Sequence, residues 1–377
     1  MKDLEFAILG AGNVGQTMAA DLRLAGYRVR LFEMEKFRRN IDPIIEKGGI
    51  EFAGIGLTPS RVGFAEISTV TTDIEEAIEG ADVVNICIPA YGHEALMNLF
   101  VPHLQDGQMV VVWPDNWGAI RLRQIMKEKG KEADIVVAGA SSCLYAGTRV
   151  TPTRVWNRRF KVNLRLAAFP KNDTLRVLET LSEPWPGHLI AGKNILEVAM
   201  CNTNWIAHPG LLIFNACRIE SDKGMFNIQK DGGSDPSFGV KSPSKLSKTL
   251  ETEIRKVQQG LGLRTDYPPV YPPGHKRAQL TEKEMEEYAK INFPGKSWPS
   301  PDHAPSTLDH RYSTEDIPFG LVPVHHFGCL VSVPTPYADA CVYLCGLLTD
   351  RDYWKEGITP EKLGWGGLTA TQILNML

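Results

Sequence analysis

Residues 4–39, LEFAILGAGNVGQTMAADLRLAGYRVRLFEMEKFRR, decide the fold of the first half of the chain. A short apolar run at 4–9 leads into a glycine-rich turn, and an amphipathic helix follows to about Ala25. A second apolar strand, 28–32, ends at Glu33. The order strand, glycine turn, helix, strand and acid predicts a unit that binds a dinucleotide.

Each glycine of the turn has a mechanical reason to be there. Gly10 permits the tight turn, Gly12 lets the backbone approach a pyrophosphate, and Gly15 lets the helix pack on the strand. Asn13 and Val14 stand at the start of the helix, where unpaired N–H groups and the helix dipole favour an anion. We therefore predict that residues 10 and 12–15 contact the cofactor.

Glu33 indicates which dinucleotide is bound. It follows Gly15 at about the distance where an acid accepts hydrogen bonds from the adenosine ribose. A carboxylate there would repel a 2′-phosphate and so favours NAD. Arg38 and Arg39 follow closely and could reverse this preference, which leaves NADP as the alternative.

The alternation of strands and helices continues beyond this unit. Apolar strands are predicted at 81–90, 107–113 and 133–140, with helical segments between them. This pattern predicts a doubly wound parallel sheet, whose ligand lies at the carboxyl ends of the strands. Pro89 and Asn116 stand at such ends and are candidate cofactor contacts, although Pro89 could equally be a plain strand terminator.

The second half of the chain is predicted to be helical. Long helical periodicities occupy 194–222 and 245–262, and an apolar helix runs through 335–348. We predict a Rossmann domain at 1–185 and an all-helical substrate domain at 186–377, with the substrate in the crevice between them.

A long stretch rich in proline and charge, 265–309, interrupts the helical half. It is predicted to be an extended loop around one helix, 281–291. Excursions of this length in compact domains are usually functional or flexible.

Composition narrows the class of protein. The hydrophobic content of 43% and charged content of 23% are those of an ordinary soluble enzyme. A net charge of −3 argues against bulk nucleic-acid binding, and no apolar run is long enough to span a membrane. Seven cysteines without a C-x-x-C pair suit a reducing compartment, so a cytoplasmic location is expected.

The helical half contains one unusual stretch, CNTNWIAHPGLLIFN at 201–215. His208 is followed by Pro209 and Gly210, two residues that disfavour a helix. We predict that they break the helix and expose His208, with Asn204 as a further substrate contact. The alternative is that His208 is a satisfied core residue.

A second polar concentration, HRYSTEDIPFG at 310–320, supplies possible partners. Arg311 carries a planar guanidinium suited to a carboxylate. Glu315 or Asp316 could orient a histidine and stabilise its cation. The alternative is a charged loop whose residues cap a helix.

Metal and thiol chemistry are not expected. The adjacent His325 and His326 diverge on a helix and have no partner ligands at suitable spacing. Cys341 and Cys345 are predicted to be packing residues. Cys143 could reach the substrate, but the chain shows no thiol-activating arrangement, so no cysteine nucleophile is expected.

Several motifs, spread over nearly the whole chain, resemble the opine dehydrogenases of the octopine and nopaline type. They are GAGNVG (10–15), SSCLYAGTR (141–149), NTNWIAHP (202–209), RYSTEDIPFGLVP (311–323), VPTP (333–336) and EKLGWGGLTA (361–370). The resemblance implies a Rossmann domain joined to a helical domain like that of 6-phosphogluconate dehydrogenase. It also implies reductive joining of an amino acid's amine to a 2-oxo acid, with a nicotinamide cofactor.

The resemblance also implies roles for three residues. His208 matches the family's catalytic histidine, Asp316 its carboxylate partner, and Arg311 the arginine that holds a substrate carboxylate. Two segments depart from the family pattern: 141–149 differs from the usual form, and 151–162 is unusually basic. The basic segment could alter the substrate or form a solvated edge.

The chemistry suits these residues. A histidine of near-neutral pKa can take a proton from the amine and return one to the departing hydroxyl. Two alternatives remain open, a 2- or 3-hydroxy-acid dehydrogenase on the same scaffold and a non-catalytic dinucleotide sensor. A homodimer through the helical domain is a further expectation.

Overall fold

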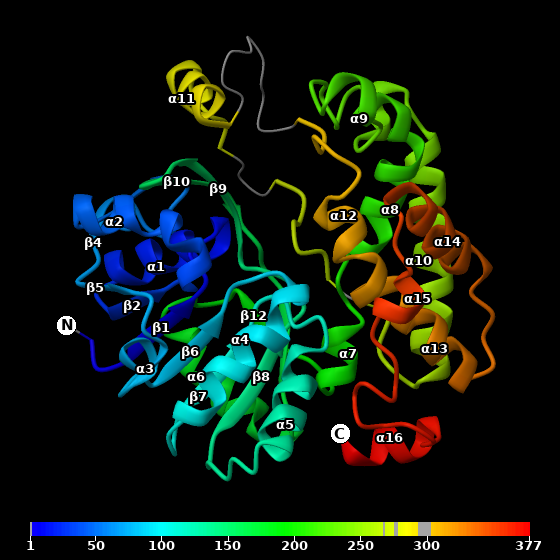
Figure 1. The fold of residues 1–377 in the computed structure, drawn as a ribbon, viewed down its shortest axis with the longest axis horizontal. Coiled ribbons are helices and arrows are strands. Elements are labelled where there is room, and N and C mark those ends of the chain that lie inside the picture. Colours follow the sequence, from blue (N-terminus) through cyan, green and yellow to red (C-terminus); the bar gives the residue numbers. More distant parts are fainter. Residues whose placement is uncertain (1, 267, 275–277, 293–302) are drawn as a thin grey trace. The chain divides into compact units, whose positions relative to one another are not determined.

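A computed structural model describes residues 2–266, 268–274, 278–292 and 303–377. Its contacts divide the chain into two compact units. Unit 1 comprises residues 1–88, 92–199 and 268–294, and unit 2 comprises 89–91, 200–267 and 295–377. Figure 1 labels their elements.

Unit 1 is built on the predicted dinucleotide-binding sheet. The central strands are mostly apolar and buried along their whole length, as in VVNI and MVVV, because parallel strands have both faces covered. Every described strand pairing in this sheet is parallel except β11 with β8. In spatial order the strands are β12 (Leu189–Ala191), β11 (Leu164–Ala168), β8 (Val136–Ala140), β7 (Met109–Val112), β6 (Val83–Ile86), β1 (Glu5–Leu9), β2 (Arg28–Phe32) and β5 (Thr69–Thr71).

A second sheet in unit 1 was not predicted. Its order is β4 (Gly63–Glu66), β3 (Gly49–Gly54), β10 (Arg154–Phe160) and β9 (Tyr145–Thr151). The basic segment 151–162 therefore contains the whole of β10 and the turn that joins it to β9. Gly147 of β9 lies against Thr17 of α1 so closely that a Cβ would overlap the threonine hydroxyl.

The helices of unit 1 alternate with the strands of the large sheet. They are α1 (Asn13–Leu24), α2 (Asp42–Lys47), α3 (Ile74–Ile78), α4 (His93–Phe100), α5 (Gly118–Glu128), α6 (Thr174–Ser182) and α7 (Ile195–Ala199), with α11 (Glu282–Asn292) added from far along the chain.

The structural division differs from the predicted boundary at 185/186. Strand β12 lies beyond that boundary yet pairs with β11, and α7 packs on β8 and β11, so the first unit continues to Ala199. The proline-rich excursion was assigned to the helical domain, but residues 268–294 return to unit 1.

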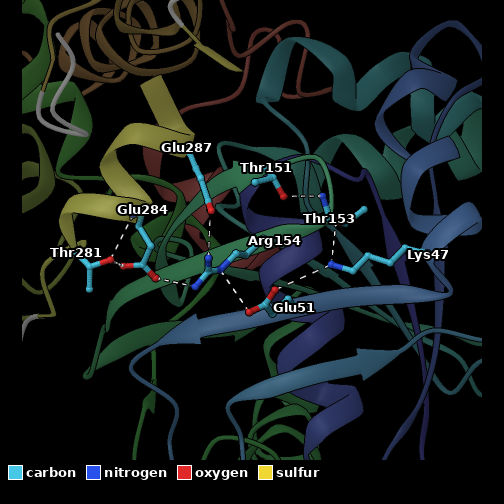
Figure 2. Close-up of polar contacts among 8 residues, drawn as sticks. All are labelled: Lys47, Glu51, Thr151, Thr153, Arg154, Thr281, Glu284 and Glu287. Carbon is cyan, nitrogen blue, oxygen red and sulfur yellow. Dashed lines mark hydrogen bonds and ion pairs between the residues drawn. The ribbon is translucent and has the colours of Figure 1, made fainter. Parts of the chain in front are cut away.

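Arg154 of β10 is a main anchor of α11. Its guanidinium donates to Glu284 at 2.9 Å and to Glu287 at 3.3 Å, and it also lies 3.5 Å from Glu51 of β3 (Figure 2). Tyr288 of this helix also belongs to an apolar cluster with Trp156 of β10. Apolar packing and the ion pairs of Arg154 therefore both join α11 to this sheet.

Unit 2 is helical, as predicted. Its helices are α8 (Asn204–Phe214), α9 (Ala216–Asp222), α10 (Ser242–Gly260), α12 (Arg311–Thr314), α13 (Val322–Leu330), α14 (Pro336–Thr349), α15 (Tyr353–Glu356) and α16 (Ala370–Met376). Helices α8, α10, α13 and α14 pack on one another (Figure 1). None of the described helices combines the length and apolarity needed to cross a membrane.

The predicted helix at 194–222 is three helices, and the predicted break inside it is wrong. Helix α8 continues through Pro209 to Phe214, and the interruptions fall at 200–203 and at Asn215 instead. Gly210 has a packing reason, because a Cβ there would lie 3.2 Å from the Pro243 carbonyl at the start of α10. The glycine therefore permits close approach of two helices rather than local unwinding.

Candidate active site

The glycine turn has the geometry expected of a dinucleotide loop. Gly10 has a φ of +107°, which favours glycine, and a Cβ on Gly15 would overlap the Gly10 carbonyl oxygen. A Cβ on Gly12 would meet no described atom within 4 Å, so the backbone is open to a ligand there. Helix α1 begins at the next residue, Asn13, with Val14 in its first turn. The residues present fit a pyrophosphate at this turn.

Glu33 lies directly after β2 and is 5% exposed. Its carboxylate accepts hydrogen bonds from the backbone N–H of Ala11 at 3.2 Å and of Met34 at 2.9 Å, and from Asn40 Nδ2 at 3.1 Å. The first of these bonds ties the acid to the glycine turn.

Cations lie close to this acid. Burial lowers the pKa of Arg149, while the charge of Glu33 opposes the shift and that of Arg39 adds to it. Arg38 is engaged by Asp42 at 3.0 Å. Of the two predicted arginines, Arg39 is thus the one whose charge acts on Arg149, as that of Glu33 does.

The two remaining cofactor candidates lie at ends of parallel strands. Asn116 follows β7 in a tight turn, is 3% exposed and has a φ of +39°. Pro89 follows β6, and its segment 89–91 belongs to unit 2. The Ala90 N–H donates to Glu315 Oε1 at 3.0 Å, which accounts for that assignment.

His208 and Asp316 form a hydrogen-bonded pair, although 108 residues separate them in the chain. Nδ1 of His208 lies 2.6 Å from Oδ2 of Asp316, and the two side chains are 13% and 1% exposed. Burial raises the pKa of Asp316 to about 7, and the charge of Arg311 opposes this shift.

Other aromatic groups surround this pair. The Tyr312 ring stacks on His208, with centroids 3.7 Å apart and planes 16° apart. His310 meets Tyr312 edge-on at 4.7 Å, and burial lowers the pKa of His310 to about 3, helped by the charges of Arg311, His208 and His303. Sequence reasoning missed Tyr312 and His310, although both adjoin Arg311 in the string DHRYSTED.

The adjacent acids, which the sequence did not separate, have different partners. Asp316 contacts His208, whereas Glu315 accepts from Ala90 and lies 4.0 Å from Arg311 Nε. Burial raises the pKa of Glu315, and the charge of Arg311 opposes the shift. Glu315 therefore holds the segment after β6, whereas Asp316 is the acid hydrogen-bonded to His208.

Arg311 lines a cavity of unit 2, and Asn204 is the first residue of α8. The Arg311 side chain is 48% exposed. It lines an open cavity of about 700 Å³ with Tyr91, Asp309, His310, Thr314, Pro318, Phe319, Arg351 and Glu356. Asn204 begins α8, one turn before His208, and its backbone N–H donates to Asn202 Oδ1 at 3.0 Å. The i,i+4 spacing places Asn204 and His208 on one face of the helix.

The two cysteines that lie one turn apart on α14 are packing residues, as predicted. Cys341 and Cys345 are at most 1% exposed, and burial raises the pKa of Cys341 to about 12. Cys143 donates to the Trp113 carbonyl at 3.4 Å.

Taken together, a dinucleotide turn on a parallel sheet and a buried histidine–carboxylate pair on a helical unit define a dinucleotide-dependent oxidoreductase. The family described as NAD/NADP octopine/nopaline dehydrogenase, alpha-helical domain, matches residues 191–349. The family described as NADP oxidoreductase, coenzyme F420-dependent, matches residues 5–112.

Similarity to individual proteins narrows this class. The opine dehydrogenase of Arthrobacter sp. (strain 1C) is 31% identical over 98% of this chain and 97% of its own. A structure of octopine dehydrogenase with NADH and pyruvate has a TM-score of 0.67 at 18% identity, covering 98% of each chain. Yersinopine dehydrogenase with NADP⁺ has a TM-score of 0.65 at 16% identity, over 99% of this chain and 97% of that one.

The chain belongs to the opine dehydrogenase family. It is an NAD(P)-dependent oxidoreductase acting on small-molecule substrates, with the Rossmann and helical architecture of that family.

Proposed function

We propose that His208 and Asp316 are the acid–base pair of an opine dehydrogenase that condenses an amino acid with a 2-oxo acid. The 2.6 Å contact between them carries the proposal. Asp316 accepts the hydrogen on Nδ1, so Nε2 of His208 is the ring nitrogen assigned to take up and return a proton.

The residues account for the proton transfers of the reaction. His208 takes a proton from the ammonium group, so that the amine can attack the ketone carbon. It then donates a proton to the departing hydroxyl as the imine forms. A bound nicotinamide would supply the hydride that reduces this imine. Asp316 holds the imidazole in place and stabilises its cation.

The substrate carboxylates need cationic or N–H anchors. We assign one of them to Arg311, whose guanidinium is half-exposed beside an open cavity and suited to bidentate binding. Asn204, one turn before His208 on the same helix face, is assigned a polar substrate contact.

We assign cofactor binding to residues 10 and 12–15, to Glu33, and to Pro89 and Asn116. Glu33 supports a preference for NAD, because a second negative charge beside it would be repelled. Arg39 and Arg149 offset part of that repulsion, so NADP is accepted more weakly. The expected homodimer stays a prediction, which light scattering in solution tests.

The test is NADH oxidation with pyruvate, measured with and without a mixture of amino acids. We expect turnover only when the amino acid is present. Turnover that ignores the amino acid would instead identify a 2- or 3-hydroxy-acid dehydrogenase. NADH binding without turnover, unchanged in His208→Gln, would identify a dinucleotide sensor.

A further inference from the structure

Unit 2 contains a second histidine–carboxylate pair, and it faces a thiol. Cys329 lies one turn after His325 on α13, and its Sγ is 3.7 Å from His325 Nε2. The other ring nitrogen, Nδ1, lies 2.8 Å from Oδ1 of Asp339 on α14. Thiol, imidazole and carboxylate thus stand in one line of hydrogen bonds, outside the His208 site.

The carboxylate fixes the state of the imidazole. An ionised carboxylate can only accept, so the proton of a neutral His325 ring lies on Nδ1 and the lone pair of Nε2 faces Cys329. Asp339 is itself held, because Thr335 Oγ1 donates to the same oxygen at 3.0 Å. The geometry therefore lets His325 take the proton of the Cys329 thiol.

The imidazole is also held by aromatic contacts. The Trp354 ring meets His325 edge-on at 4.9 Å, and the His326 ring does so at 5.3 Å. An exposed cysteine–histidine pair on a helix is otherwise free to rotate apart. Here the ring that would accept the proton is oriented from α14 and from α15.

The thiol is accessible to a solute. All seven cysteines lie among the described residues, and two of them are exposed, Cys329 and Cys217. His325 is 31% exposed, so a small molecule that reaches Cys329 also finds the base beside it. Cys217, on α9, is a matched exposed thiol within the same protein.

We propose that Cys329 is a modification site, a nucleophilic thiol that exchanges with low-molecular-weight disulfides. His325 Nε2 takes the thiol proton, and Asp339 stabilises the resulting imidazolium. The Cys329 sulfur attacks one sulfur of the disulfide, so a protein mixed disulfide forms as the original S–S bond breaks. The released thiolate takes the proton from His325. Cys329 is oxidised, and half of the small disulfide is reduced.

The sequence did not reveal this arrangement as a thiol site. The i,i+4 spacing of His325 and Cys329 is visible in the sequence, but Asp339 joins them only through the packing of α13 on α14. The proposal for Cys329 thus departs from the expectation that the chain has no thiol-activating arrangement.

The test uses the full chain with oxidised glutathione at a fixed neutral pH. Mass spectrometry of the intact protein and of its peptides gives the rate of mixed-disulfide formation at each cysteine. We expect Cys329 to react about tenfold faster than Cys217, because His325 Nε2 lies beside the Cys329 sulfur and can accept its proton as the thiol attacks.

Three variants separate the base from general exposure. His325→Gln should reduce the Cys329 rate to that of Cys217, and Asp339→Asn should reduce it in part. His103→Gln, a control at a histidine of unit 1 that pairs with Glu75, should leave the Cys329 rate unchanged. Thermal unfolding of each variant shows whether it is folded. If His325→Gln does not fold, the Cys329 rate in Asp339→Asn is the test instead. Equal rates at Cys329 and Cys217 in the parent protein, or a Cys329 rate that persists in a folded His325→Gln, would overturn the proposal.

Discussion

Replacing Asp316 by Asn tests the proposed acid–base pair at the level of single atoms. The substitution keeps the size of the side chain and removes its charge. In the parent protein Asp316 Oδ2 contacts His208 Nδ1, whereas Oδ1 is buried and has no hydrogen-bond partner among the described residues. The two positions of the carboxylate therefore differ, and an amide must choose between them.

The choice decides which ring nitrogen of His208 carries the proton. With its oxygen toward Nδ1, the amide would bury its NH₂ group at the position where the described residues offer no acceptor, at a cost of about 1–3 kcal/mol. With its NH₂ toward Nδ1, the amide places an oxygen where Oδ1 now lies. We expect the second orientation, which leaves the proton on Nε2 and prevents His208 from acting as a base.

The loss should be that of a positioned acid–base group. Such groups contribute about 10²- to 10⁴-fold to the rate. At about 1.4 kcal/mol for each factor of ten, this raises the barrier by about 3–5 kcal/mol. Because neither Asp316 nor His208 is part of the glycine turn, the affinity for NADH should change little in Asp316→Asn.

The assay is kcat for NADH oxidation with saturating 2-oxo acid and amino acid, together with NADH affinity from the fluorescence of the bound cofactor. Asp316→Asn should lower kcat by the stated factor and keep NADH affinity within about twofold. Glu315→Gln is the comparison for a neighbouring buried acid whose carboxylate accepts from the Ala90 N–H. A kcat within threefold of the parent in folded Asp316→Asn would refute the assignment.

Unfolding experiments give this variant a second readout. Burial raises the pKa of Asp316 from 3.8 to about 7, so the folded state holds a proton that the unfolded state has released. Between about pH 4 and 7 the folded state binds more protons, and this group's contribution to the free energy of unfolding falls as pH rises. Asn has no such titration. The melting temperature of Asp316→Asn relative to the parent should therefore rise across this range, and a constant difference would contradict the argument.

Three further substitutions test the cofactor unit. Gly15→Ala should lower NADH affinity at least tenfold in a binding titration, because its Cβ overlaps the Gly10 carbonyl and displaces the turn; unchanged affinity would mean that the turn does not bind the cofactor. Glu33→Gln should change the ratio of kcat/KM for NADH to kcat/KM for NADPH by about tenfold in favour of NADPH, since a charge-assisted hydrogen bond is worth about 1.5–3 kcal/mol. An unchanged ratio would mean that Glu33 does not bind the ribose. Arg154→Gln should destabilise the docking of α11 by about 1 kcal/mol or less, because the ion pairs of Arg154 are partly exposed. The measurement is hydrogen exchange, which should become faster only in peptides of 278–292. Exchange that is unchanged there, or faster across the whole chain, would show that Arg154 does not anchor the helix.

The local elements could be predicted from the sequence because their causes are local. The glycine turn depends on contacts among Gly10, Gly15 and the strand beside them, and the spacing of those residues states the requirement directly. The central strands are mostly apolar, and the helical half shows its periodicity. The architecture and the family-level chemistry followed from these signals.

Other features depended on packing that no local pattern contains. The sequence left Glu315 and Asp316 as equal partners for His208, and only the turn of the backbone around Asp316 separates them. The small second sheet, the return of 268–294 to unit 1 and the approach of Asp339 to His325 also join segments that are distant in the chain.

Helix α8 shows the division most clearly. The sequence by itself determined that a helix would place His208 and Asn204 on one face, because the 3.6-residue period fixes that relation. It did not determine that the helix continues through Pro209, nor that Gly210 serves the contact with α10. Propensity measures the cost of a residue in an isolated helix, whereas burial against a neighbour supplies the energy that offsets it. Tertiary packing therefore decided where the helix ends and which acid meets the histidine.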